Sequence, residues 1–161
     1  MIKIEIDIDT LSITHALQRL QTAGANPRPV LQEIGEYLVV STKERFKSKK
    51  APDGSTWADN SPATQAQKKG RSDPLVGESK SLSRQIHYRT TANTLTVGSP
   101  MEYSAVQQFG ASQGQFGKTG RGRPIPFGDI PARPFLGLSK DDEDNITDII
   151  NEYLEGLIRP S

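Results

Sequence analysis

The clearest pattern in the chain is SKDDEDNITDIINEYLEGLI at residues 139–158, and the fold depends on it. Its apolar residues recur at intervals of three and four: Ile146, Ile149, Ile150, Tyr153, Leu154, Leu157 and Ile158. This spacing places them on one face of a helix. Ser139 can cap that helix, and Asp141, Asp142 and Glu143 lie in the first turn, where the helix dipole favours anions. The segment is therefore predicted to be a long amphipathic C-terminal helix, which we expect to pack on a sheet.

Two kinds of signal predict the strands of that sheet: alternation with a period of two, and residue types that favour strands. The isoleucines of Ile2–Ile8 share one face of an extended segment, opposite charged residues. Further along, a hairpin is predicted, with one strand at Ile86–Arg89, a turn at residues 90–93 and a second strand at Thr94–Val97. Threonine and valine suit a half-buried strand surface. The sheet is expected to be small and antiparallel.

Other segments have helical spacing. Thr10 to about Ala23 and Val30–Phe46 carry apolar stripes, and shorter helices are predicted at Ser61–Lys69, around Leu82 and at Pro100–Phe109. The sequence thus predicts a single α+β domain over residues 1–161, with a small antiparallel sheet, flanking helices and the long C-terminal helix.

The least regular part of the chain is the segment from about 110 to 130. It contains Gly110, Gly114, Gly117, Gly120, Gly122 and Gly128, together with Pro124 and Pro126. Such a composition predicts a flexible glycine-rich loop. Trp57, Tyr103 and Phe109 are predicted to be structural anchors that hold the neighbouring loops and short helix to the body.

Bulk composition excludes several classes of function. Twenty basic residues against nineteen acidic ones give a net charge of +1, so no overall attraction to nucleic acid or an anionic membrane is expected. The chain has no cysteine, which excludes disulfides, thiolate metal sites and cysteine nucleophiles. Its N-terminus alternates isoleucine with charged residues and resembles neither a signal peptide nor a membrane span. We expect a soluble protein of a reducing cytoplasm.

One basic motif leaves a DNA-binding alternative open. Arg121-Gly122-Arg123-Pro124 resembles the core of an AT-hook, in which arginines enter a narrow minor groove. The basic end of the second helix, from Lys43 to Lys50, could add phosphate contacts, although cations at a helix C-terminus also suit its dipole. Gly117-Lys118-Thr119 lacks the preceding glycine and the strand of a phosphate-binding loop. With a net charge near zero, a solvated loop or a subunit contact is the favoured explanation of these residues.

No pattern for catalysis, a metal or a cofactor is recognised. His15 and His87 have no partner ligand at metal-binding spacing, and the acidic run at residues 141–144 lacks the arrangement of a calcium loop. No Gly-x-Ser-x-Gly nucleophile elbow occurs. We therefore expect no enzymatic activity and no cofactor.

Four segments together resemble the phage virion morphogenesis family, the tail-completion proteins of P2-like and Mu-like phages. They are Ala51–Trp57 with Ser61–Thr64 and Lys68–Gly70, then Leu75-Val76 with Leu82 and Ile86, then Tyr103–Gly110, and Ile130–Ser139. The resemblance covers most of the chain from about Arg45 onward. Two departures are Gln107, where similar proteins often have histidine, and Glu78–Lys80, where they have a glycine-containing turn.

The resemblance implies a structural component that completes the tail and prepares it for joining to the head. Such a component is expected to form a homo-oligomeric ring at the head-proximal end of the tail, in contact with other tail or neck proteins. The residue types support this expectation. The segment at residues 131–136 is stiffened by proline and so loses little conformational entropy on binding, and it offers Arg133 and Phe135, which are of the types that anchor interfaces. The predicted subunit-interface residues are Arg121, Arg123, Arg133, Phe135 and Leu136.

Overall fold

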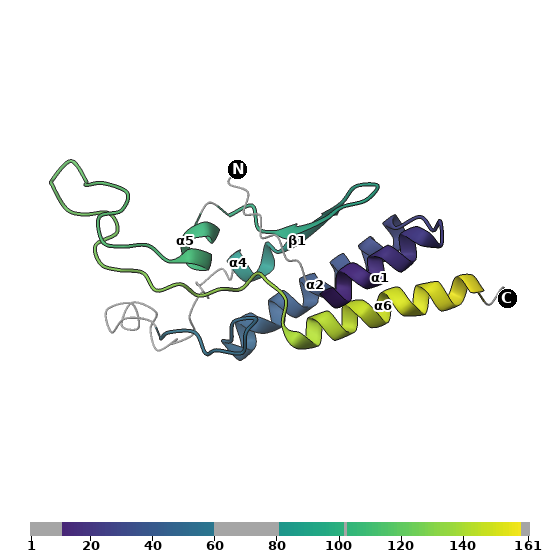
Figure 1. Ribbon diagram of the computed structural model, residues 1–161. Helices are drawn as coiled ribbons and strands as arrows, with labels where there is room; N and C mark the ends of the chain where they lie inside the picture. Colours follow the sequence, from purple (N-terminus) through teal and green to yellow (C-terminus); the bar gives the residue numbers. More distant parts are fainter. Residues whose placement is uncertain (1–10, 60–80, 102, 159–161) are drawn as a thin grey trace.

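Figure 1 shows an elongated molecule in which three long helices lie together at one end and a thin arm projects from the other. This computed structural model describes residues 11–59, 81–101 and 103–158. The long helices are α1 (Leu11–Thr22), α2 (Arg28–Ser48) and α6 (Lys140–Ile158). The shorter elements are α4 (Ser81–Arg84), β1 (His87–Thr90), β2 (Leu95–Gly98) and α5 (Ser104–Phe109).

The three long helices bury an apolar core between them. It consists of Ala16 and Leu20 of α1, Val30 and Ile34 of α2, and Ile146 and Ile150 of α6. The helix predicted at residues 139–158 is confirmed, but it packs against α1 and α2, while the sheet packs against α2. The expected packing of α6 on the sheet is therefore wrong.

The first turn of α6 is closed by its own side chains. Ser139 Oγ accepts a hydrogen bond from the Asp142 N–H at 3.0 Å, and the Asp142 carboxylate accepts one from the Ser139 N–H at 3.0 Å. This reciprocal arrangement is a capping box with aspartate as the returning side chain, and it satisfies two backbone donors at the helix start. Ser139 caps the helix as the sequence predicts.

The hairpin is confirmed, and it rests on α2 at a glycine. Strand β1 pairs antiparallel with β2, so that Tyr88 lies opposite Val97. A Cβ built on Gly35 of α2 would lie 2.5 Å from Tyr88 Cδ2 and 2.9 Å from Leu95 Cδ1. Any larger residue at position 35 would therefore push the hairpin away from the helix.

A second apolar cluster joins the end of α2 to the short elements. The ring of Phe46 packs edge-on against Trp57, with centroids 5.5 Å apart, and at a tilt against Phe135, with centroids 5.6 Å apart. Leu82 and Ile86 complete this cluster around the fully buried Phe135. Residues far apart in the sequence thus share one core at the base of the arm.

The α+β class, the small antiparallel sheet and the long C-terminal helix are confirmed. Most element ends lie within a few residues of their predicted positions, and the helix predicted from Pro100 begins at Ser104. The strand predicted at Ile2–Ile8 and the helix predicted at Ser61–Lys69 lie outside the described residues.

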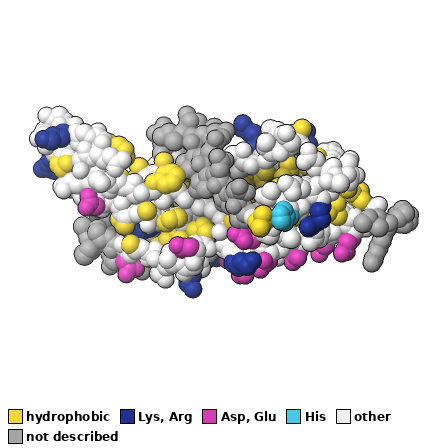
Figure 2. Space-filling model, in the orientation of Figure 1, with side chains coloured by type: hydrophobic (Ala, Val, Ile, Leu, Met, Phe, Trp, Pro, Cys, Tyr) yellow, Lys and Arg dark blue, Asp and Glu magenta, His cyan; other side chains and the backbone are white. Residues whose placement is uncertain are grey.

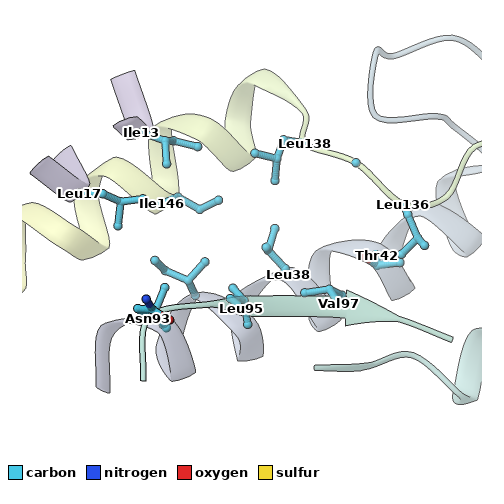
Figure 3. A pocket seen from close by; sticks show the side chains of 13 residues that line it. Ile13, Leu17, Leu38, Thr42, Asn93, Leu95, Val97, Leu136, Leu138 and Ile146 are labelled. Carbon is cyan, nitrogen blue, oxygen red and sulfur yellow. The ribbon is translucent and has the colours of Figure 1, made fainter. Parts of the chain in front are cut away.

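An apolar cavity of about 350 Å³ lies where the helices meet the hairpin. In Figure 3, Ile13 and Ile146 border it on one side, and Leu95 and Val97 border it on the other. The described lining contains no titratable side chain, so the cavity favours apolar packing over the binding of a charged ligand.

Candidate interaction arm

Residues 111–130, which we call the arm, pair with one another along much of their length. At the base, Ala111 and Ile130 exchange backbone hydrogen bonds of 3.0 and 2.7 Å. Farther out, the Phe116 N–H donates to the Ile125 carbonyl at 2.9 Å, and nearer the tip Lys118 forms a bridge with Pro124. The glycine-rich loop predicted here contains no helix or strand, and its flexibility stays a prediction. Backbone bonds join its two legs, which stand away from the helices (Figure 1).

The arm leaves the body at Gly110, and only glycine fits there. Its φ is +74°, and an added Cβ would lie 2.6 Å from the Ile130 carbonyl oxygen and 2.8 Å from the Ala132 nitrogen. A side chain would strain the backbone and would also collide with the opposite leg. Gly110 therefore lets the two legs approach closely at the base.

The arm exposes aromatic and basic side chains together. Phe116 is 55% exposed and Phe127 is 66% exposed. The tip carries the exposed cations Lys118, Arg121 and Arg123, and Figure 2 shows basic side chains at this end of the molecule. Large aromatic side chains left in water beside arginine are typical of a surface that binds another protein.

Gln108 of α5 clamps the chain just beyond the arm. Its side-chain oxygen accepts hydrogen bonds from the backbone N–H groups of Phe135 and Leu136, both at 3.0 Å, and its nitrogen donates to the Leu136 carbonyl at 3.0 Å. The Arg133 N–H adds a bond of 2.7 Å to the Gln107 carbonyl. Because Gln108 is buried, these bonds lie out of water and fix the extended segment against α5.

A buried ion pair fixes the same segment to α2 and α6. The Arg45 guanidinium contacts the Asp142 carboxylate and donates to the Phe135 carbonyl at 2.8 Å. Asp142 also accepts hydrogen bonds from Tyr37 at 2.9 Å and Ser41 at 2.6 Å. Arg45 is 6% exposed and Asp142 is 1% exposed. One charged pair thus connects α2, the segment after the arm and the start of α6.

The surroundings lower the pKa values of Asp142 and Arg45 and raise the pKa of Tyr37. Burial alone raises the pKa of Asp142, but hydrogen bonds from Ser139 and Ser41 and the charge of Arg45 outweigh it and leave that pKa below its ordinary value. Burial lowers the pKa of Arg45, although the charge of Asp142 opposes the shift. Burial and the bond to Asp142 raise the pKa of Tyr37. The pair is therefore held in its charged form by its hydrogen bonds.

The predicted interface residues separate into two groups. Arg121 and Arg123 are exposed at the tip of the arm, and their role in an interface stays a prediction. Phe135 is fully buried and Leu136 is 6% exposed, both within the chain's own core. Arg133 is buried and donates to the Ala58 and Asp59 carbonyls at 2.8 and 2.9 Å.

The expectation that Arg133, Phe135 and Leu136 present their side chains to a partner is corrected, because internal bonds and packing already occupy them. Burial lowers the pKa of Arg133, and the charge of Asp59 opposes this shift. Proline-stiffened segments suit an interior clamp as well as an interface, which is why the sequence pattern did not separate the two roles.

The predicted anchors also behave differently from one another. Trp57 is buried and donates a hydrogen bond from Nε1 to the Pro134 carbonyl at 2.8 Å. This bond joins the loop of Trp57 to the segment that follows the arm. Tyr103 and Phe109 are 42% and 62% exposed, so neither attaches α5 to the body, contrary to the prediction. Helix α5 instead turns Ser104 and Gln108 inward, since the amide of Gln108 is needed by the segment beyond the arm.

The basic end of α2 is less available than the DNA-binding alternative requires. Arg45, at its centre, is buried in the ion pair with Asp142. Lys47 pairs with Glu44 at 3.0 Å. Of the described residues on which this alternative relies, the cations of the arm tip and the exposed Lys43 and Lys50 remain to face a phosphate backbone.

Within the described ranges 11–59, 81–101 and 103–158, no group of three or more histidine or acidic side chains is placed to hold a metal ion. No described helix is both long enough and apolar enough to span a bilayer.

Fold and site together define a small α+β protein that presents a paired, exposed arm from a helical body. Residues 8–155 match the Phage virion morphogenesis family, and the chain therefore belongs to that family. Among its relatives, the Mu-like prophage FluMu G protein 2 of Haemophilus influenzae is 33% identical over 159 residues, which cover 99% of this chain and 100% of the relative. Tail completion protein S of Escherichia phage P2 is 29% identical over 147 residues, which cover 89% of this chain and 93% of the relative. No solved structure matches the chain.

Proposed function

We propose that this chain completes the tail of a phage particle and prepares it for joining to the head, acting through protein–protein contacts and without catalysis. Membership of the virion morphogenesis family and the likeness to tail completion protein S of phage P2 support a tail role. The contacts are with other tail or neck proteins, at the head-proximal end of the tail.

The exposed aromatic side chains of the arm give the strongest support for this proposal. Their contact with water is unfavourable in free energy, and burial against a protein partner would be favourable. Phe116 and Phe127 are exposed to water, although the core at the base of the arm holds six other aromatic or branched side chains. Burying one such ring against a partner is worth about 1.5–3 kcal/mol. A backbone-paired arm also has less conformational freedom to lose on binding than an open loop.

Complementation of a phage that lacks this chain tests the proposal. We expect lysates without the chain to accumulate heads and unjoined tails in electron micrographs, and the added wild-type chain to restore joined particles. The Phe116→Ala/Phe127→Ala variant should lower infectious titre by at least about tenfold, since aromatic residues at an interface commonly contribute more than 1.4 kcal/mol each.

Val40→Ala serves as the matched control, because Val40 is 61% exposed on α2 and far from the arm in the chain. It should restore titre as well as the wild type. Joined particles in the absence of the chain would overturn the tail-completion role. Full restoration by the double arm variant would overturn the role of the arm.

A further inference from the structure

The charges of this chain are sorted between its two ends. The arm contains three cations near its tip and a single acidic residue, Asp129, at its base. Helix α6 has the opposite composition: Lys140 at its first position is its only basic residue within Lys140–Ile158, and its last turn has none. A net charge of +1 therefore conceals a basic arm tip and an acidic helix α6.

Five exposed carboxylates form one stripe along α6. They are Asp141, Asp144, Asp148, Glu152 and Glu155, at successive intervals of three, four, four and three residues. Residues at these intervals lie above one another on a helix, and the stripe is about 21 Å long at 1.5 Å per residue. Figure 2 shows acidic side chains following the lower edge of the molecule where α6 lies.

Among the described residues no ion pair reaches the far end of this acidic stripe, and the neighbouring cation contact on α6 is that of Arg19, which donates to Asn151 at 2.8 Å. Lys140 pairs with Asp144 at 3.1 Å, but no ion pair within the described part of the chain involves Asp148, Glu152 or Glu155. Like charges four residues apart repel, and anions near a helix C-terminus oppose its dipole. The stripe therefore disfavours the isolated helix, and a cationic partner would relieve this.

The geometry points to the arm of a second copy as that partner. We propose that the arm of one chain docks along the acidic stripe of α6 in the next chain, with Lys118, Arg121 and Arg123 facing Asp148, Glu152 and Glu155. This proposal rests on the assembly role proposed above and names the partner of the arm.

The dimensions of the two surfaces agree. Asp148 to Glu155 covers about 10 Å along the helix at 1.5 Å per residue. The three cations lie within one turn of a paired hairpin, whose legs are about 5 Å apart, so their long side chains reach over a similar distance.

The two surfaces cannot meet within one molecule, because the arm projects from the end opposite to the far end of α6 (Figure 1). The contact is therefore head to tail, between different patches of neighbouring copies. Contacts of this kind produce closed rings when the rotation between copies closes, and filaments when it does not. A ring would agree with the assembly expected from the family resemblance.

Reciprocal charge reversal on the purified chain tests this contact by sedimentation velocity and native mass spectrometry at low ionic strength. The arm variant is Lys118→Glu/Arg121→Glu/Arg123→Glu, and the stripe variant is Asp148→Lys/Glu152→Lys/Glu155→Lys. Each alone should weaken self-association at least about tenfold, because like charges would then face each other across the contact. An equimolar mixture of the two should associate again, since the reversed stripe suits the reversed arm.

The control variant is Glu33→Lys/Glu36→Lys/Glu44→Lys, which reverses three exposed charges on α2 and should associate as the wild type does. Wild-type association should also weaken at about 1 M salt, where the screening length is about 3 Å. Circular dichroism of every variant checks that the fold is kept.

A wild-type chain that stays monomeric, or one whose association neither reversal affects, overturns the proposal. The proposal is also overturned if the equimolar mixture stays dissociated. The same holds if the arm reversal abolishes binding to DNA or to tails while self-association continues. These outcomes are distinct from failure of the tail role, which is measured separately by whether the wild-type chain restores joined particles.

Discussion

Replacing Asp142 with asparagine should destabilise the fold more than any change to the exposed carboxylates of the same helix. The Asp142 side chain accepts from Tyr37 and Ser41 and contacts Arg45 while almost fully buried. Asparagine keeps one acceptor oxygen but places an NH2 group, which donates, where the carboxylate accepts from Arg45. Arg45 is then left charged in the interior with only the Phe135 carbonyl and neighbouring hydroxyls.

The expected loss for Asp142→Asn is about 3–5 kcal/mol, the range for breaking a buried ion pair by removal of one partner. The four interactions of the carboxylate would sum to more than this if each were counted separately, but they share one group and are not additive. A domain is stabilised by about 5–15 kcal/mol in total, so a loss of this size removes a large fraction. At about 2–4 °C per kcal/mol for a chain of this size, Tm should fall by about 6–20 °C.

The stability difference between wild type and variant should also depend on pH. The folded-state pKa of Asp142 lies below its ordinary value, so its contribution is present above the unfolded-state pKa, about 3.9, and is lost as pH falls through the folded pKa. Asparagine does not titrate in this range. The two unfolding curves should therefore approach each other below about pH 4.

Urea unfolding followed by circular dichroism at neutral and acidic pH measures both effects. Asp144→Asn is the matched control, because Asp144 is exposed on the same helix and pairs only with Lys140, and it should cost less than about 1 kcal/mol. The reasoning is refuted if Asp142→Asn is as mild as this control. It is refuted equally if the neutral-pH loss persists unchanged at pH 3.

Two further substitutions test the packing around the arm and the hairpin. Gly35→Ala should destabilise by up to about 2 kcal/mol by thermal unfolding, because overpacking against Tyr88 costs about 1–3 kcal/mol and the better helix propensity of alanine returns about 1 kcal/mol; a higher Tm would contradict the close approach. Gln108→Met keeps the size of the side chain but leaves the buried N–H groups of Phe135 and Leu136 without their acceptor, and should cost about 2–4 kcal/mol in urea unfolding; a neutral result would show that the clamp is not needed.

The local features of the fold were accessible to sequence reasoning. The spacing of isoleucine and leucine in residues 139–158 fixed a helix face, and Ser139 three residues before Asp142 gave a capping signal; both are found in the structure. The hairpin was found from its residue types, since threonine and valine suit a half-buried strand surface. Such signals depend on neighbours within a few residues.

The long-range pairs were not accessible in this way. Arg45 looked like one cation among the lysines at the end of α2, and Asp142 like one of four acids in a helix start, although they are the two that the fold buries together. Nothing in their local sequence distinguishes them, because their pairing depends on the antiparallel placement of two helices. Gln108 was missed similarly, since Tyr103 and Phe109 appeared to be the packing residues of that helix.

These buried bonds connect the two surfaces that the proposed assembly uses. From the arm, the chain passes the Gln108 clamp, the Phe135 carbonyl that Arg45 holds, and the Ser139 cap at the start of α6. A ring closes only if each copy presents its two contact surfaces at one fixed angle. A buried ion pair with one satisfied geometry can set such an angle where apolar packing alone would tolerate several. We therefore expect Asp142→Asn, under conditions in which it remains folded, to broaden the distribution of oligomer sizes in native mass spectra as well as lower stability. A variant that is destabilised yet forms oligomers of unchanged size would show that the network serves the fold alone.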